Sequence, residues 1–122
     1  MSSNATVSSK TFRDPTACVE MVLQANMAAN DCGTWMYVGG YEKKTIHVIV
    51  ANANVTMCGS NLPTQPDNAN DDGVTLQLAN GANAVFSANA IFEHKAPIKW
   101  IKAKVAVTGA NASASAYLQG AP

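Results

Sequence analysis

The sequence has few charged residues. Lys, Arg, Asp and Glu make up 13% of its 122 residues, against roughly 25% in an average soluble domain. Eight basic residues balance eight acidic ones. A general nucleic-acid-binding protein needs a basic excess to displace counterions from phosphates, so we expect no nucleic-acid partner. A surface so poor in charge is weakly protected against association, which suits a protein that packs against other proteins.

Long apolar runs are absent too. No stretch approaches the roughly 18 apolar residues of a membrane span, and the first ten residues contain no apolar core of a secretory signal. We therefore expect no membrane partner and synthesis in a cytoplasm. The cysteines, Cys18, Cys32 and Cys58, match no zinc-binding spacing. Three free thiols are the expectation in a reducing compartment, with a later Cys18–Cys32 bridge as the alternative.

Signatures of catalysis are also missing. The two histidines, His47 and His94, lie far apart without metal-ligand spacing. We interpret His47 as a structural residue of a central strand and His94 as a surface residue in a connecting segment. Asp67, Asp71 and Asp72 lack the order of an EF-hand loop and are interpreted as solvated carboxylates. The sequence thus predicts no catalytic residue, no metal site, no cofactor and no enzymatic activity.

The sequence does contain a series of short β-strand patterns. The expected strands are 18–30 (where a short helix is the alternative), 34–38, 45–53, 55–58, 74–78, 84–87, 98–107 and 113–118. Asn80-Gly81 predicts a tight turn, and 113–118 is expected to pair antiparallel with 98–107. On 98–107, Ile101, Val105 and Val107 are predicted core residues. The 59–73 segment is a long loop, and such loops are usually functional or mobile.

Seven or eight short strands with regular turns predict an all-β domain over residues 17–122. The expected architecture is an antiparallel β-sandwich, similar to a jelly roll. Residues 1–16 are rich in Ser, Thr and Asn and are predicted to form a flexible, extended N-terminal arm. Its large apolar side chains, Val7 and Phe12, are candidate anchors on a neighbouring subunit.

Two aromatic groups are candidate contact residues. Trp100 shares a predicted strand face with Lys102 and Lys104. Either Trp100 covers the edge of the core while the lysines are solvated, or an aromatic anchor rimmed by cations binds a partner's acidic surface. Trp35, Tyr37 and Tyr41 lie close in sequence, and they either pack in and around the core or form an aromatic platform for sugars.

Two segments resemble small virion proteins of tailed bacteriophages. Residues 55–61 (VTMCGSN) are similar to a strand followed by Gly-Ser-Asn in those chains. Residues 97–109 (PIKWIKAKVAVTG) and 113–118 (SASAYL) resemble their closing hairpin. The likeness extends over roughly residues 45–120. The family often has Arg at the positions of Lys102 and Lys104, and residues 17–44 have no counterpart in it.

The resemblance implies a β-sandwich decoration (cement) protein or a similar accessory protein of the phage head or tail. Decoration proteins of this kind are often homotrimers, so the implied partners are copies of the chain and the major capsid protein, and the implied location is the virion. The alternative function is a receptor- or glycan-binding module of a fibre, spike or tail. In both, the chain acts by binding and not by catalysis.

Overall fold

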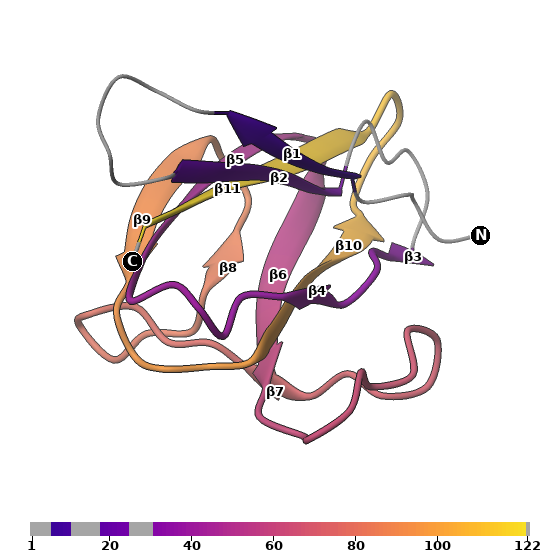
Figure 1. The fold of residues 1–122 in the computed structure, drawn as a ribbon. Helices are drawn as coiled ribbons and strands as arrows, with labels where there is room; N and C mark the ends of the chain where they lie inside the picture. Colours follow the sequence, from indigo (N-terminus) through magenta and orange to yellow (C-terminus); the bar gives the residue numbers. More distant parts are fainter. Residues whose placement is uncertain (1–5, 11–17, 25–30, 122) are drawn as a thin grey trace.

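The fold is described from a computed structural model, in which the backbone is described for residues 6–10, 18–24 and 31–121 and the side chains from residue 32 to residue 121. These residues form eleven strands and no helix (Figure 1). Accordingly, the described part of the chain holds no helix that is long and apolar enough to cross a membrane. The prediction of an all-β, antiparallel fold is confirmed.

The strands form two antiparallel sheets. The five-stranded sheet has the order β1 (Thr6–Lys10), β2 (Cys18–Gln24), β11 (Ser113–Ala121), β5 (Lys43–Ala51) and β9 (Ala90–His94). The six-stranded sheet has the order β3 (Asp31–Cys32), β10 (Trp100–Val107), β6 (Ala53–Ser60) and β7 (Val74–Thr75), with β4 (Met36–Tyr37) beside β10 and β8 (Val85–Phe86) beside β6. Four of the strands are only two residues long, and the other seven have five to nine residues.

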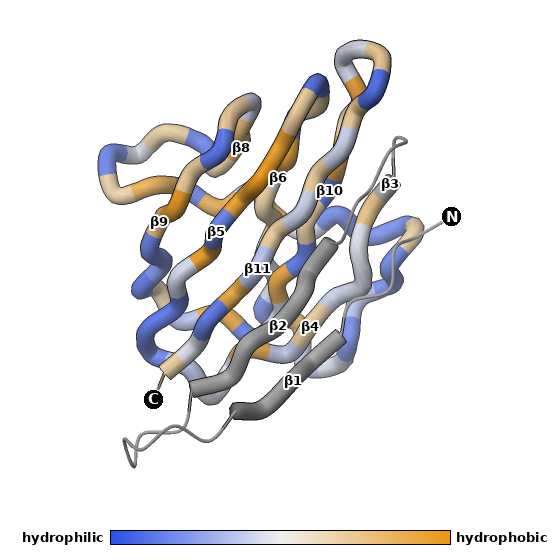
Figure 2. Tube along the Cα trace, turned by 90° about the horizontal axis from the view of Figure 1, so that it is seen from above, coloured by the Kyte–Doolittle hydropathy of each residue, from blue (hydrophilic) through white to orange (hydrophobic). Residues whose placement is uncertain are grey.

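The hydrophobic core lies between the two sheets. Along β5 every second residue is buried, so Ile46, Val48 and Val50 point inward and the residues between them point to solvent. Ile101 and Val105 of β10 are buried, as predicted. Val107 is half-buried and packs against the same cluster. Figure 2 shows the apolar stretches of β5 and β6 close together. Period-two alternation produces this arrangement because successive side chains of a strand point to opposite faces.

Two of the connections between the sheets are hydrogen-bonded to each other. β5 leads to β6 through Asn52, which has a left-handed φ of 53°. β10 leads to β11 through residues 108–112. The amides of Thr108 and Gly109 donate to the Asn52 carbonyl oxygen at 2.9 and 3.2 Å, and the Asn52 side chain donates to the Ala110 carbonyl oxygen at 2.9 Å. The two crossovers therefore form one hydrogen-bonded unit.

The prediction that 113–118 pairs with 98–107 in a C-terminal hairpin is wrong. β10 pairs with β3, β4 and β6, whereas β11 pairs with β2 and β5, so the two strands lie in opposite sheets. The predicted strand 45–53 is likewise divided at Asn52, and its second part starts β6. Alternation specifies which face of a strand is buried, but two strands with apolar inner faces can either pair within a sheet or pack across a core. The sequence pattern does not distinguish the two arrangements.

Three further side chains differ from their predicted positions. His94 belongs to β9, a strand that the sequence did not indicate, and it is buried with 7% exposure. His47 lies on β5 as expected but faces solvent. Alternation along the expected strand 74–78 predicts that Val74 and Leu76 share one face, but Val74 is 73% exposed whereas Leu76 is buried. The alternation of β9 is hidden in the sequence because a histidine takes an inward position that an apolar residue usually fills.

The predicted N-terminal arm is described in part. Thr6–Lys10 forms β1 and pairs antiparallel with β2, which places Val7 opposite Met21. Residues 1–5 and 11–17, Phe12 included, lie outside the described residues, as does the Val7 side chain. The strand preference of Cys18–Gln24 over a helix is confirmed. The anchoring role of Val7 and Phe12 stays a prediction.

Candidate binding surfaces

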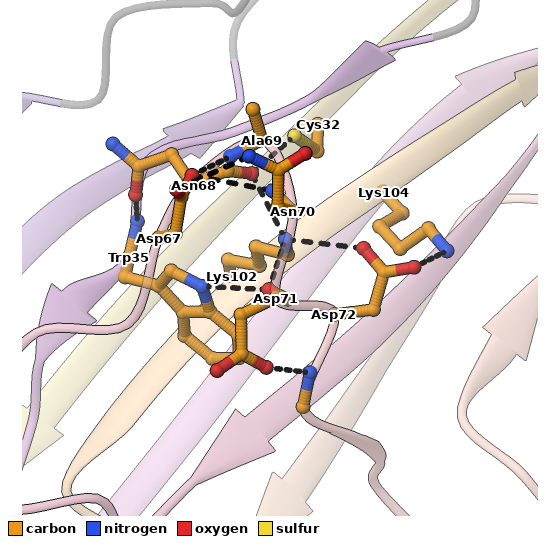
Figure 3. Close-up of polar contacts among 11 residues, drawn as sticks. Cys32, Trp35, Asp67, Asn68, Ala69, Asn70, Asp71, Asp72, Lys102 and Lys104 are labelled. Atoms are coloured by element: carbon orange, nitrogen blue, oxygen red, sulfur yellow. Dashed lines mark hydrogen bonds and ion pairs between the residues drawn. The ribbon is translucent and has the colours of Figure 1, made fainter.

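A folded loop covers the outer face of β10. Residues 61–73, here called the capping loop, lie over Trp35, which is 1% exposed (Figure 3). The Trp35 amide donates to Asn68 Oδ1 at 2.9 Å and its indole Nε1 donates to the Asp71 carbonyl oxygen at 3.1 Å. Gln65 Nε2 donates to the Trp35 carbonyl oxygen at 2.9 Å. The loop is therefore an ordered second layer on the six-stranded sheet.

Lys102 is the centre of this layer. Its side chain is fully buried. Its ammonium donates to the carbonyl oxygens of Asn68 and Asp71 at 3.2 and 2.9 Å, and lies 5.0 Å from the centre of the Trp35 ring. A carboxylate oxygen of Asp72 is 3.4 Å away. The interpretation of Lys102 as a solvated or partner-facing residue is therefore wrong, because its donors are used inside the chain.

Lys104 is also engaged within the chain. Its ammonium lies 2.9 Å from the second oxygen of Asp72. This hydrogen bond is the main cause that lowers the pKa of Asp72 and raises that of Lys104. Lys104 remains partly exposed, so it can still touch a partner, but its charge is balanced. The single carboxylate of Asp72 thus offsets one of the two positive charges of the predicted cationic rim around Trp100.

Two cysteines lie in the same region. Cys32 Sγ is 2.8 Å from the Asn68 carbonyl oxygen, and Cys58 pairs with Lys102 in the strand register. Cys58 has a free, buried thiol whose pKa is raised, first by burial. A raised pKa disfavours the thiolate, which is the reactive form. Cys58 therefore acts as a small apolar residue under the loop, whereas the side chain of Cys18 lies outside the described residues.

An aromatic pair lies beside the capping loop. Tyr37 and Trp100 meet edge to face, with ring centres 5.2 Å apart and an interplanar angle of 73°. Trp100 Nε1 donates to the Leu62 carbonyl oxygen at 3.0 Å. Tyr37 is 55% exposed, whereas Trp35 is buried and Tyr41 is half-buried. The structure thus separates the predicted Trp35–Tyr37–Tyr41 group and instead joins Tyr37 to Trp100.

The outer face of the five-stranded sheet forms a second surface. His47 of β5 stands opposite Tyr117 of β11 and Ile91 of β9 in the register, with the His47 and Tyr117 ring centres 6.4 Å apart. Ile91 is 65% exposed and Ile49 is 43% exposed. We call the surface formed by these four residues and Thr45 the assembly face. Sequence alternation placed His47 and Ile49 together on one side of β5, but only the sheet order adds Ile91 and Tyr117.

A pair of buried basic residues lies at the end of β5 and β9. Lys44 is fully buried, and its ammonium donates to the carbonyl oxygens of Tyr41 and Ala96, both at 3.2 Å. His94 stands opposite it in the register. Burial lowers the pKa of both groups, and the charge of Lys44 lowers that of His94 further. The Nδ1 atom of His94 has no hydrogen-bond partner in the described part of the chain.

The described side chains include no group of three His, Cys, Asp or Glu residues placed to hold a metal ion. Asp67 instead accepts from the amides of Ala69 and Asn70 at 2.8 and 3.2 Å, and these bonds, that of Ala69 first, lower its pKa. The three loop aspartates thus shape and attach the capping loop. No protein-family model matches this chain, and no curated protein matches it.

Proposed function

We propose that this protein is a non-enzymatic structural component of a tailed-phage particle. It decorates and stabilises the capsid by binding copies of itself and the major capsid protein. The phage assignment rests on the sequence resemblance of residues 55–61, 97–109 and 113–118 to small virion proteins, although β10 and β11 do not form the hairpin that this resemblance implied. The assembly face is the observation that carries the binding role, because it presents apolar side chains without a charged residue among them. Two of its members, Ile49 and Ile91, are exposed large apolar side chains, and exposed apolar side chains gathered on one face are typical of protein contact sites.

Two charged residues, Lys43 and Glu93, lie at the edges of this surface. Lys43 starts β5, and Glu93 stands opposite Thr45 across β5 and β9. An apolar centre with a polar rim is the usual organisation of a protein interface. The capping loop gives the opposite sheet a rigid outer layer, so the five-stranded sheet is the more open face for contact with a lattice.

The assembly face can be tested with two charge substitutions at similarly exposed sites. Ile91→Lys places a charge in the surface, and Val85→Lys places one on β8, where the side chain is 47% exposed. We expect Ile91→Lys to weaken binding to a bare capsid lattice about tenfold or more, because the lysine must be desolvated. Val85→Lys should bind like the natural chain. If both variants bind the lattice equally well, the assembly face is excluded as the contact surface.

The N-terminal segment is a second point of contact in this proposal. β1 pairs with β2 at the edge of its sheet, and a neighbour in a trimer can supply the same strand in the same register. Exchange of an identical element is a low-cost route to oligomers. Val7 and Phe12 are the proposed anchors of the exchanged segment. Deleting residues 2–13 should leave the sandwich folded but weaken trimer formation, measured by analytical ultracentrifugation. Unchanged assembly would show the segment to be passive.

A further inference from the structure

The exposed ring of Tyr37 is held in a fixed position. Its edge-to-face contact is with Trp100, which is itself bound to the capping loop by the hydrogen bond from Nε1 to the Leu62 carbonyl oxygen. The ring also lies across Gly39, where an added Cβ would be 2.6 Å from the Tyr37 Cζ atom. A ring that is already ordered loses little conformational entropy when a ligand stacks on it. This arrangement is typical of a binding platform.

Two adjoining hollows lie beside this ring. The first has a volume of about 430 Å³ and is lined by Tyr37, Gly39, Asn61, Pro97, Ile98 and Lys99. The second, of about 340 Å³, shares Gly39, Pro97 and Ile98 and continues to Tyr41, Glu42 and Lys95. The first volume falls within the range of roughly 300–1,000 Å³ that small-molecule sites occupy. Because the hollows share three lining residues, they adjoin, and together they are here called the trough.

We propose that this trough binds an oligosaccharide. A pyranose ring has an apolar C–H face, which can stack on Tyr37, and a rim of hydroxyl groups, which needs polar partners. Asn61 accepts from the Lys99 amide through its Oδ1 at 2.9 Å, which leaves its amide N–H groups as donors. The Lys99 side chain is exposed and forms no ion pair with any residue from 32 to 121. Glu42 supplies an acceptor at the far end of the trough.

The polar groups around the ring favour a hydroxylated ligand over a protein surface. The centre of a protein contact site is usually depleted in charged residues, whereas Lys95, Lys99 and Glu42 all line this trough. Among the lining residues only Tyr37 lies in a strand, β4 of the six-stranded sheet, and the others lie in the segments that connect strands, whereas the assembly face lies on strands of the other sheet. Saccharide binding therefore does not depend on the proposed capsid contact, and one protein can have both.

The test starts with the full chain on a printed array of neutral and carboxylated oligosaccharides. The best-bound free oligosaccharide is then titrated while tryptophan fluorescence is recorded. Trp35 is buried, so the change in emission reports on Trp100. We expect Tyr37→Ala to weaken binding about tenfold or more. Gly39→Ala should weaken it comparably, because it displaces the ring without removing it. The Tyr37 side chain can rotate away, so the fold should persist, which a thermal unfolding curve checks.

Tyr117→Ala is the matched control, since it removes a tyrosine from the opposite sheet and should leave saccharide affinity unchanged. Ile91→Lys should also leave it unchanged, which separates this site from the assembly face. The proposal is overturned if the array gives no signal, or if Tyr37→Ala and Gly39→Ala bind as tightly as the natural chain. Loss of lattice binding in Tyr37→Ala, without any saccharide binding by the natural chain, would instead assign the aromatic pair to a protein contact.

Discussion

Two fully buried lysines in this molecule have very different surroundings. The ammonium of Lys102 has two carbonyl oxygens, a carboxylate oxygen and an aromatic ring around it. The ammonium of Lys44 has two carbonyl oxygens, and a buried histidine stands across the sheet from its residue. Burial lowers the pKa of Lys44. A buried cation is costly unless hydrogen bonds and an opposite charge compensate it, and only Lys102 has both.

The comparison shows that equal burial does not mean equal importance. Lys102 connects β10 to residues about thirty positions earlier in the chain, so it attaches the capping loop to the sheet. Lys44 binds Tyr41, three residues before it, and Ala96, just beyond β9. We infer that Lys102 specifies a tertiary arrangement, whereas Lys44 mainly satisfies two carbonyl groups at the end of the core.

The largest predicted effect is for Lys102→Met, which keeps an unbranched side chain but removes the ammonium. The carbonyl oxygens of Asn68 and Asp71 then lose the ammonium and keep only the Cys32 thiol and the Trp35 indole as donors, while Asp72 loses a partner charge. We expect a loss of about 2–4 kcal/mol in the free energy of unfolding. Urea denaturation measures it. Proteolysis within residues 61–73 should also become faster. Lys104→Met, which removes the partly exposed partner of the same Asp72, should cost about 1 kcal/mol or less. Equal effects of the two substitutions would contradict the role given to Lys102.

Val105→Ala provides an apolar reference on the inner face of the same strand. Val105 is 4% exposed, and we expect a cost of about 1–3 kcal/mol from lost burial and the cavity that remains. Chemical denaturation again gives the value. If Ile101→Ala, Val105→Ala and Val107→Ala all leave the unfolding midpoint unchanged, the two faces of β10 have been assigned in reverse.

A smaller effect is expected from pH, through His94. Its pKa in the folded chain lies below the ordinary value of 6.5, so the unfolded chain takes up a proton first as pH falls through that value. Stability should therefore be highest above about pH 6.5 and decrease as pH falls toward the folded pKa. The midpoint of thermal unfolding, recorded at several values between about pH 8 and about pH 5, measures this decrease. His94→Phe should flatten the decrease, and His47→Gln, at an exposed position, should not. An unchanged slope in His94→Phe would exclude His94 as its source.

The smallest effect is predicted for Lys44→Met. The substitution removes the cost of burying an ammonium but leaves the Tyr41 and Ala96 carbonyl groups without their donor, so the two changes oppose each other. We expect a net change within about 1 kcal/mol at neutral pH. Because the pKa of Lys44 is lowered on folding, the natural chain should gain stability as pH rises toward its ordinary value, and the variant should lack that gain. A loss as large as that of Lys102→Met would contradict the comparison.

Local patterns in the sequence predicted which face of a strand is buried better than they predicted which strands pair with each other. The inward residues of β5 and the core positions Ile101 and Val105 follow from alternation alone. The placement of β11 does not follow from alternation. Residues 108–112 connect β10 to a strand of the other sheet, and the pattern of apolar residues in the two strands does not indicate this. The Asn80-Gly81 turn is confirmed by the hydrogen bond from the Gly81 amide to the Leu78 carbonyl oxygen at 2.9 Å.

The candidate surfaces were less accessible to prediction for a similar reason. A lysine at an outward position of a strand is normally solvated, and Lys102 differs because a loop distant in sequence covers it. The burial of His94 depends on the neighbouring strand, not on its own segment. Tyr37 and Trp100 meet only because β4 pairs with β10. The features that the sequence did not predict therefore depend mostly on contacts between residues that are far apart in the chain.

The place of β11 in its sheet has a mechanical consequence. This C-terminal strand lies between β2 and β5 and is hydrogen-bonded to both, whereas β1 borders β2 alone among the strands that the structure describes. Tension applied along β11 loads two ladders in shear, and many bonds must break together. Tension applied along β1 in the same way loads one ladder, so fewer bonds share the force. A linkage through the C-terminus would therefore withstand a greater load than one through the N-terminus, and pulling the chain from each end in turn should give two distinct rupture forces.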